Sequence, residues 1–222
     1  MKKIFISFVF LFACLWMYAQ QCTTMWPYLY SDFAEGKVFY KSGNTESRYL
    51  NIHVLENRLH LVDGENISEL KSTNNIAKVE IGWDTYLPIE GRFYQLISEG
   101  STGSSLVLII SGDFRSLLEG SGAYGASSNS LSTTNLSSLE IGGNAGSMNH
   151  MNLKNNKDAG RDVPLVKKYF FVFGGNLVPT KSKDVEKSLL DSGKRKELKA
   201  FVKANKIKWN RPEDLAKLLA IL

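Results

Sequence analysis

The sequence predicts an α+β protein in which an antiparallel, β-rich body is followed by a C-terminal helical pair. Short apolar or alternating runs, separated by turn residues, follow one another from Tyr28 to about Phe114. They do not alternate with helical patterns, as the βαβ units of a parallel sheet would. After residue 180 the apolar spacing changes to that of helices. The body is therefore expected to be a meander, a sandwich or a partial barrel.

The chain begins with the features of an export signal. Lys2 and Lys3 precede thirteen almost wholly apolar residues, 4–16. A run of that length suits a signal peptide core, which has ~7–15 residues, and is short of the ~20 needed to span a bilayer. Ala19 offers a small residue at a cleavage site. Residues 1–19 are therefore predicted to be a signal peptide, and the protein is expected in the periplasm or associated with the outer membrane.

The alternative to cleavage after residue 19 is a lipoprotein. Residues 11–14 loosely resemble a bacterial lipobox, with Cys14 as the acylated residue. The bulky Phe12 and the apolar residues that follow count against it. After ordinary cleavage Cys22 is the remaining cysteine, so no internal disulfide is expected. No second apolar stretch is long enough to form a transmembrane span.

The body, residues 20–180, contains the predicted strands in close succession. Residues 63–66 are expected to reverse the chain, and Gly174 and Gly175 mark another turn. In residues 76–81, alternation predicts Ala77 on the same face as Val79 and Ile81. The predicted strands are 36–41, 48–55, 58–63, 76–81, 85–89, 92–97, 105–111 and 168–173.

Two histidines lie in the hairpin predicted at residues 48–63. If Val54 pairs with Leu59, His53 faces His60 directly, on the outer side of the sheet. Two such imidazoles can share a zinc or copper ion, although a third ligand is lacking nearby. The favoured interpretation is an ordinary exposed pair.

Residues 119–162 are rich in Gly, Ser, Asn and Thr and are interpreted as a mobile insertion, because unstructured loops beyond ~12–15 residues are uncommon. Gly120 to Gly125 matches G-x-G-x-x-G but lacks the strand and helix that a dinucleotide site needs. His150 also lies here, no G-x-S-x-G elbow is present, and no hydrolytic triad is evident. We therefore assign no catalytic, cofactor-binding or metal residue, and an enzyme is not favoured.

An aromatic cluster lies near the start of the body. Trp26, Tyr28 and Tyr30 share one face of an extended segment, with Phe33 close behind. If exposed, these rings would stack on sugars or dock on a partner. The favoured interpretation is that they belong to the core.

Residues 181–222 are predicted to form basic helices packed on the same domain. Helical patterns cover 183–190 and 194–205, and Asn210 is expected to cap the last helix, with Glu213 at capping-box spacing. The predicted core positions are Leu198, Phe201 and Val202, then Leu215, Leu218, Leu219 and Leu222.

The positive charge is concentrated at the C-terminal end. Residues 161–222 hold 15 basic and 7 acidic residues, a net +8, whereas residues 1–160 hold 12 basic and 15 acidic residues, a net −3. A basic segment binds nucleic acid or anionic lipid. Export argues against nucleic acid, so the alternatives are anionic lipid or lipopolysaccharide and, as the favoured interpretation, a solvated helix face.

Two regions together resemble a group of uncharacterised secreted or envelope proteins common in Bacteroidota, which pair a signal peptide, often ending Ala-Gln, with a strand-rich body and a basic helical tail. The resemblance implies compartment and organism class and brings no active-site residues. It covers most of the chain beyond the signal peptide except the insertion. The matching segments are 59–64, 79–82, 86–88, 198–208, 213–215 and 218–219, with Ala19-Gln20.

The expected function is a non-catalytic binding or scaffold module for an envelope partner. The alternatives are a cell-surface glycan-binding module or glycan-active enzyme, and a binder of anionic lipid or lipopolysaccharide. No cofactor is expected.

Overall fold

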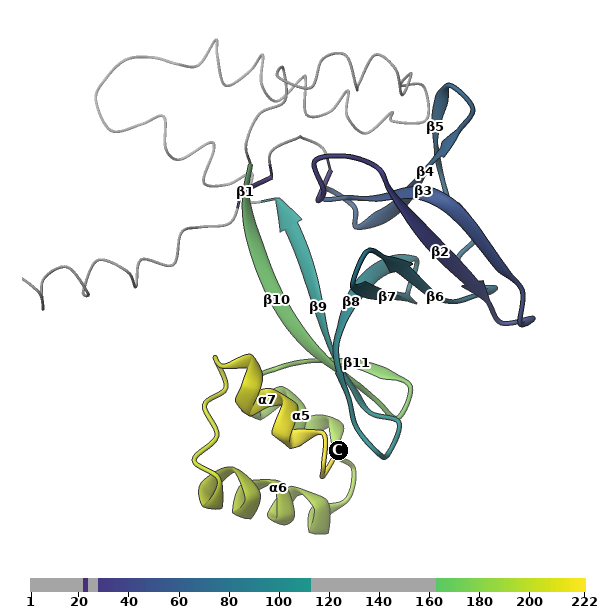
Figure 1. Ribbon diagram of the computed structural model, residues 1–222. Coiled ribbons are helices and arrows are strands. Elements are labelled where there is room, and N and C mark those ends of the chain that lie inside the picture. Colours follow the sequence, from purple (N-terminus) through teal and green to yellow (C-terminus); the bar gives the residue numbers. More distant parts are fainter. Residues whose placement is uncertain (1–21, 24–27, 113–162) are drawn as a thin grey trace, which may run out of the picture.

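A computed structural model describes residues 22–23, 28–112 and 163–222 (Figure 1). Several sequence predictions fall outside the described residues. These are the signal peptide, the lipobox cysteine Cys14, Trp26, the insertion at 119–162, the Gly120–Gly125 motif and His150.

The predicted α+β class is confirmed, with an antiparallel β-rich body and helices near the C-terminus (Figure 1). The strands are β1 (Cys22–Thr23), β2 (Ala34–Tyr40), β3 (Thr45–His53), β4 (Arg58–Asp63), β5 (Asn66–Glu69), β6 (Ile76–Ile81), β7 (Asp84–Ile89), β8 (Arg92–Glu99), β9 (Ser105–Gly112), β10 (Val163–Phe173) and β11 (Asn176–Pro179). The helices are α5 (Ser182–Ser188), α6 (Ser192–Ala204) and α7 (Pro212–Leu218).

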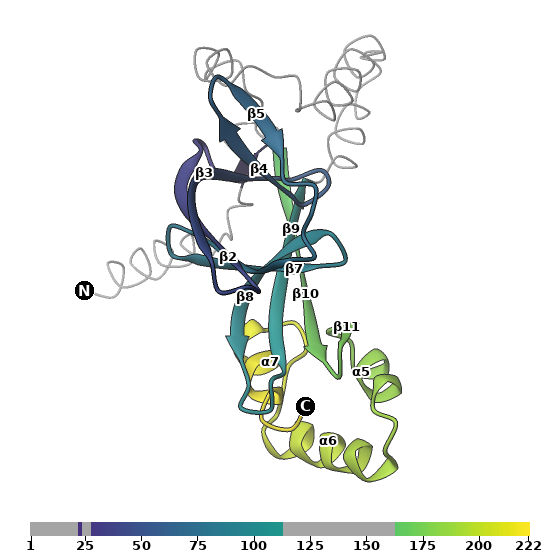
Figure 2. The ribbon, with the colours of Figure 1, turned by 90° about the vertical axis from the view of Figure 1, so that its right-hand side faces the viewer.

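Two antiparallel meanders are joined by one crossover. The strand order is β1-β10-β9-β8-β7-β6-β2-β3-β4-β5, with β11 paired to β10. One meander consists of β2 to β5 and the other of β6 to β10. The sheet curls without closing (Figure 2), and the β3–β4 turn of the first meander reaches back to β8 and β9 of the other. There Phe93 N donates to Asn57 O at 2.8 Å and Gly112 N donates to Val54 O at 3.3 Å. Of the architectures that the sequence left open, the partial barrel describes it best.

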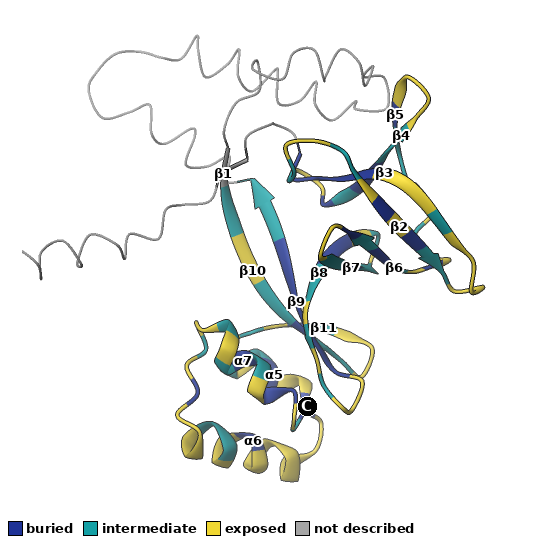
Figure 3. Ribbon diagram, viewed as in Figure 1, coloured by how far each residue is buried: buried dark blue, intermediate teal, exposed yellow. Residues whose placement is uncertain are grey.

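Apolar side chains from most strands of the curled body form one buried cluster, and the buried stretches of these strands are dark blue in Figure 3. Because alternate residues of a strand face opposite sides, Leu50 and Ile52 of β3 both lie in this cluster, as do Val79 and Ile81 of β6. The buried members are Val38, Leu50, Ile52, Leu59, Ile76, Val79, Ile81, Tyr86 and Phe93.

The apolar run in β9 is buried on both faces, as a continuous apolar run predicts. Leu106 packs in the cluster that includes the helices, with Phe171 of β10. Val107 and Ile109 pack on the other face with Tyr94, whose ring meets Phe170 edge-on at 5.9 Å.

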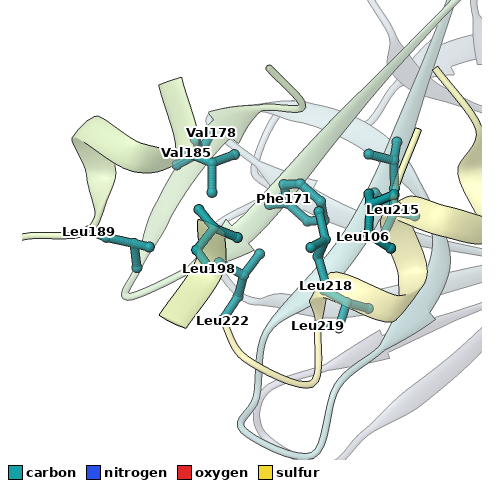
Figure 4. Packing of buried hydrophobic residues seen from close by; sticks show 11 residues of the cluster. Leu106, Phe171, Val178, Val185, Leu189, Leu198, Leu215, Leu218, Leu219 and Leu222 are labelled. Atoms are coloured by element: carbon teal, nitrogen blue, oxygen red, sulfur yellow. The ribbon is translucent and has the colours of Figure 1, made fainter. Parts of the chain in front are cut away.

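The helices pack their predicted leucine face against β9, β10 and β11 (Figure 4). The four positions predicted for the last helix are all buried, although only Leu215 and Leu218 lie within α7, and Leu219 and Leu222 follow its end. The remaining buried partners are contributed by α5, α6 and the sheet, so one cluster joins all three helices to the strands. The members are Leu106, Phe171, Val178, Val185, Leu189, Leu198, Ile207, Leu215, Leu218, Leu219 and Leu222.

Two predicted helix starts were wrong. The cap of α7 is Arg211, not Asn210, and the Asp214 carboxylate instead accepts from Lys208 N at 3.1 Å. Helix α6 starts at Ser192 because Asp191 caps it, its carboxylate accepting from Gly193 N. The capping-box spacing at 210–213 was thus a coincidence of composition.

The predicted face of Ala77 was also wrong. A β-bulge shifts the register between Phe39 and Tyr40, so that Tyr40 pairs with Ile76. Ile76 is therefore buried beside Val79, and Ala77 is exposed. A bulge changes the alternation by one residue, which a pattern in one strand cannot reveal.

Gly36 of β2 lies where the backbones of neighbouring strands approach closely. A Cβ there would lie 2.5 Å from the Glu80 carbonyl oxygen and 2.8 Å from Leu50 Cδ1. Only glycine fits this position without a shift of the sheet.

In the described part of the chain, no helix is long and apolar enough to cross a membrane.

Candidate functional site

The two histidines of the β3–β4 hairpin are buried neighbours, although not in the predicted pairing. His53 pairs with Arg58 and His60 pairs with Asn51, two residues from the predicted register. A shift by two keeps both histidines on one side of the sheet, so their rings stack with centroids 4.9 Å apart.

The prediction of an exposed pair was wrong, because His53 is 2 % exposed and His60 is 4 % exposed. The segment before β2 covers them. Tyr28 forms a bridge with His53, and Leu29 N donates to Ile52 O at 2.9 Å. The Tyr28 ring stands edge-on to both imidazoles, with centroid distances of 5.8 Å and 5.6 Å. For Tyr28 the predicted core role is confirmed, and Tyr30 and Phe33 are partly buried.

Burial sets the protonation of this cluster. It lowers the pKa of His60 from 6.5 to about 3, with smaller contributions from His53 and Arg58. The Tyr28 hydroxyl lies 3.0 Å from His60 Nδ1, and burial raises the pKa of Tyr28. A neutral imidazole with a phenol donating to Nδ1 satisfies both groups. The arrangement holds the loop onto the sheet and presents no proton acceptor to solvent.

The geometry does not suit the metal that the sequence left open. Two histidines that share an ion point ring nitrogens at one centre, whereas these rings lie 21° from parallel and are stacked. Within residues 22–23, 28–112 and 163–222, no group of three or more His, Cys, Asp or Glu side chains could hold an ion.

Asn51, opposite His60 in β4, fixes the covering segment. Its side-chain oxygen accepts from Tyr30 N at 3.1 Å, and its nitrogen donates to Tyr30 O at 2.9 Å and to Asp32 O at 3.1 Å. Asn51 is itself buried. No pattern in the sequence singles out Asn51, because its partners are backbone atoms of a segment some twenty residues away.

A second polar network ties the same segment to the β6–β7 turn. The Tyr30 hydroxyl donates to Asp84 at 2.6 Å and is hydrogen-bonded to the Tyr86 hydroxyl. Gln95 Nε2 donates to the other Asp84 oxygen at 2.6 Å. Burial is the largest cause that raises the pKa of both tyrosines. Asp84, the first residue of β7, is therefore held from two sides.

Trp83, the residue before Asp84, is fully exposed. It occupies a two-residue turn, because Ile81 pairs with Asp84, and Gly82 has φ 59°. On the neighbouring strands, Tyr49 is 57 % exposed and pairs with Glu35, which is also exposed. Sequence analysis missed Trp83. The available signal was Gly82 between the strands predicted at 76–81 and 85–89, which places Trp83 in a turn but does not show that its side chain is uncovered.

An open depression of about 740 Å³ lies at the β2–β3 turn. Its carboxylate, Glu46, already accepts from the Tyr40 hydroxyl and from Arg48. The Glu46 carboxylate is therefore already engaged by neighbouring side chains, and the depression is open and not enclosed. It is lined by Tyr40, Lys41, Ser42, Asn44, Thr45, Glu46 and Asn75.

Helix α6 carries several basic side chains of the C-terminal part, and they lie away from its buried side. In α6 only Leu198 is buried, and the lysines are exposed.

No protein-family model, curated protein or solved structure matches the chain.

Proposed function

We propose that the protein is a non-catalytic binding or scaffold module that holds a partner of the cell envelope, with Trp83 as the central contact. The observation that carries this is a fully exposed tryptophan beside a residue fixed from two sides. Tryptophan and tyrosine dominate the energies of protein interfaces, and rigid anchors lose little entropy on binding. Tyr49 of β3 pairs with Glu35 of β2, and Glu35 precedes Gly36, which pairs with Ile81 directly before the Trp83 turn.

The state of the titratable groups supports binding rather than catalysis. His60 and Tyr28 satisfy one another beneath the covering segment, and Tyr30 is engaged by Asp84 and Tyr86. A general base must reach the proton that it abstracts. In the described part of the chain, these groups serve packing. The predicted export signal and the resemblance to envelope proteins of Bacteroidota support a place in the periplasm or at the outer membrane.

A glycan is the second candidate partner. Sugar rings stack on exposed aromatic faces, and carboxylates accept hydrogen bonds from sugar hydroxyls. Trp83 and Tyr49 offer the faces, and Glu35, opposite Tyr49, offers the carboxylate. The aromatic cluster that the sequence suggested for this role does not supply it in the described residues, because Tyr28 is buried and Tyr30 is partly buried.

The test is site-specific photo-cross-linking in cells that export the protein. A photoreactive phenylalanine analogue replaces Trp83 in one variant and Glu65 in the other. The control is closely matched, since Gly64-Glu65 is also a two-residue turn after which the chain pairs back, and Gly64 has φ 61°.

A discrete adduct from position 83 that is absent from position 65, and that weakens when Tyr49→Ser is added, would support the proposal. Adducts of equal yield from both positions, or from neither, would contradict it. If position 83 yields a carbohydrate-containing adduct instead of a protein one, the glycan candidate replaces the scaffold.

A further inference from the structure

One side of α6 carries a line of lysines. Lys196, Lys199 and Lys203 are spaced three and four residues apart, which places them along one face of α6, and Lys206 lies just beyond the end of the helix. Lys206 follows the C-cap residue Asn205 and has φ 50°, so the helical geometry ends before it, and all four side chains are exposed. Lys199 forms an ion pair with Glu186 of α5 at 3.1 Å. The other three have no carboxylate partner among the ion pairs of the described residues.

An exposed leucine lies at the start of this line. Leu190, in the connection from α5 to α6, is 93 % exposed, whereas Leu189 beside it is buried. Arg195 fixes the connection, since its Nε donates to Leu189 O at 2.6 Å and its Nη2 donates to Leu190 O at 3.4 Å. Arg195 stands one turn before Lys199 on the same face. Leu190 is thus held outward at the N-terminal end of the lysine line.

We propose that Leu190 and the lysine line of α6 form a docking surface for an anionic lipid bilayer. The lysines complement the negative charge of lipid headgroups, and an apolar side chain among them enters the boundary between headgroups and acyl chains. Residues 181–222 hold twelve basic and six acidic residues, so the whole helical part is attracted to such a surface. A fixed, exposed leucine distinguishes a bilayer from a soluble polyanion, which would gain little from it.

This surface is separate from the one around Trp83. Helix α6 belongs to the cluster at β9, β10 and β11, whereas Trp83 lies between β6 and β7 (Figure 1). Either surface can therefore fail its test without affecting the other.

The test compares variants of the full chain for co-sedimentation with vesicles of phosphatidylglycerol and phosphatidylcholine, and with vesicles of phosphatidylcholine alone. The first variant combines Lys196→Gln, Lys203→Gln and Lys206→Gln and keeps the Lys199 ion pair. Each lysine near an anionic surface contributes about five-fold in partitioning, so the triple variant should bind about 100-fold more weakly.

The control variant combines Lys37→Gln, Lys41→Gln and Lys71→Gln, three exposed lysines of the body, and removes the same net charge. It should bind within about three-fold of the parent, because screening limits charges that lie away from the bilayer. Leu190→Ser should weaken binding about ten-fold, in line with the loss of one inserted leucine.

Preferential binding to the anionic vesicles with this ranking of variants supports the proposal. Equal weakening by the two triple variants would show a general effect of net charge and overturn it. Equal binding to both kinds of vesicle would also overturn it. A third refuting outcome combines two results: the lysines are needed for retention on immobilised heparin, and Leu190→Ser has no effect on vesicle binding.

Discussion

The buried histidine predicts a loss of stability in mild acid. The pKa of His60 is about 3 in the folded protein against an ordinary 6.5, which the unfolded chain is expected to show. Between these values the unfolded state binds a proton that the folded state does not, so the free energy of unfolding falls as the pH falls below about 6.5. At about pH 5 the difference of some 1.5 pH units corresponds to about 2 kcal/mol.

Urea unfolding followed by tryptophan fluorescence, at about pH 7 and about pH 5, measures this difference. With a denaturant dependence of about 2 kcal/mol per molar, 2 kcal/mol moves the midpoint by about 1 M. The control is the double variant Tyr28→Phe with His60→Leu, which removes the titrating group and its phenol partner together and so leaves no orphaned hydroxyl. Its midpoint should change much less between the two pH values.

Other titrating groups act in a different window. Hydrogen bonds from Tyr40 and Arg48 lower the pKa of Glu46, and those from Lys217 and Lys208 lower the pKa of Asp214. The stability that these carboxylates contribute is present above their ordinary pKa values of 4.5 and 3.8 and is lost below them. Their contribution is therefore nearly the same at pH 5 and at pH 7 and adds little to the difference between the two midpoints. Equal midpoints for the parent chain at both pH values, or an equal shift in the double variant, would refute the assignment to His60.

Two further comparisons test packing. Gly36→Ala should lower the free energy of unfolding by about 2–3 kcal/mol, because the new Cβ meets the Glu80 carbonyl oxygen. The control Gly193→Ala in α6, where the nearest neighbour of the new Cβ would be 3.3 Å away, should change it by less than about 1 kcal/mol. Chemical denaturation measures both, and similar costs would contradict the close approach in β2. Leu218→Ala should cost about 2–5 kcal/mol because Leu218 is fully buried, and the exposed Leu190→Ala should stay within about 0.5 kcal/mol. A small effect at Leu218 would show that α7 is not part of the cooperative core.

Periodicity predicted what depends on one element at a time. The leucine face of α7 needs only the spacing of Leu215, Leu218 and Leu219, and all three are buried. The strand predicted at residues 105–111 likewise corresponds to β9. Such positions follow from the geometry of a single helix or strand, so the sequence was sufficient to find them.

The histidine pair shows where that reasoning ends. Alternation correctly placed His53 and His60 on one side of the sheet, but the register depended on the loop of the hairpin, in which Asn57 has φ 57° and its N–H donates to His53 O at 2.8 Å. Burial depended on a different segment altogether, since Tyr28 covers the pair. The pattern in residues 48–63 contains no information on what that segment does. A side of a sheet can be deduced locally, whereas its exposure cannot.

The two proposed contact residues share one structural feature. Trp83 and Leu190 are both exposed, and each directly neighbours a fixed residue: Asp84 in its hydrogen-bond network and Leu189 in the helical core. Turns and connections are where a fold can expose an apolar side chain without opening its core. A fixed neighbour limits how far the exposed residue moves, so less conformational entropy is lost when it is buried in a complex. An exposed aromatic or aliphatic side chain on a loose loop would lack this advantage, which is why these two positions, and not exposure alone, carry the proposals.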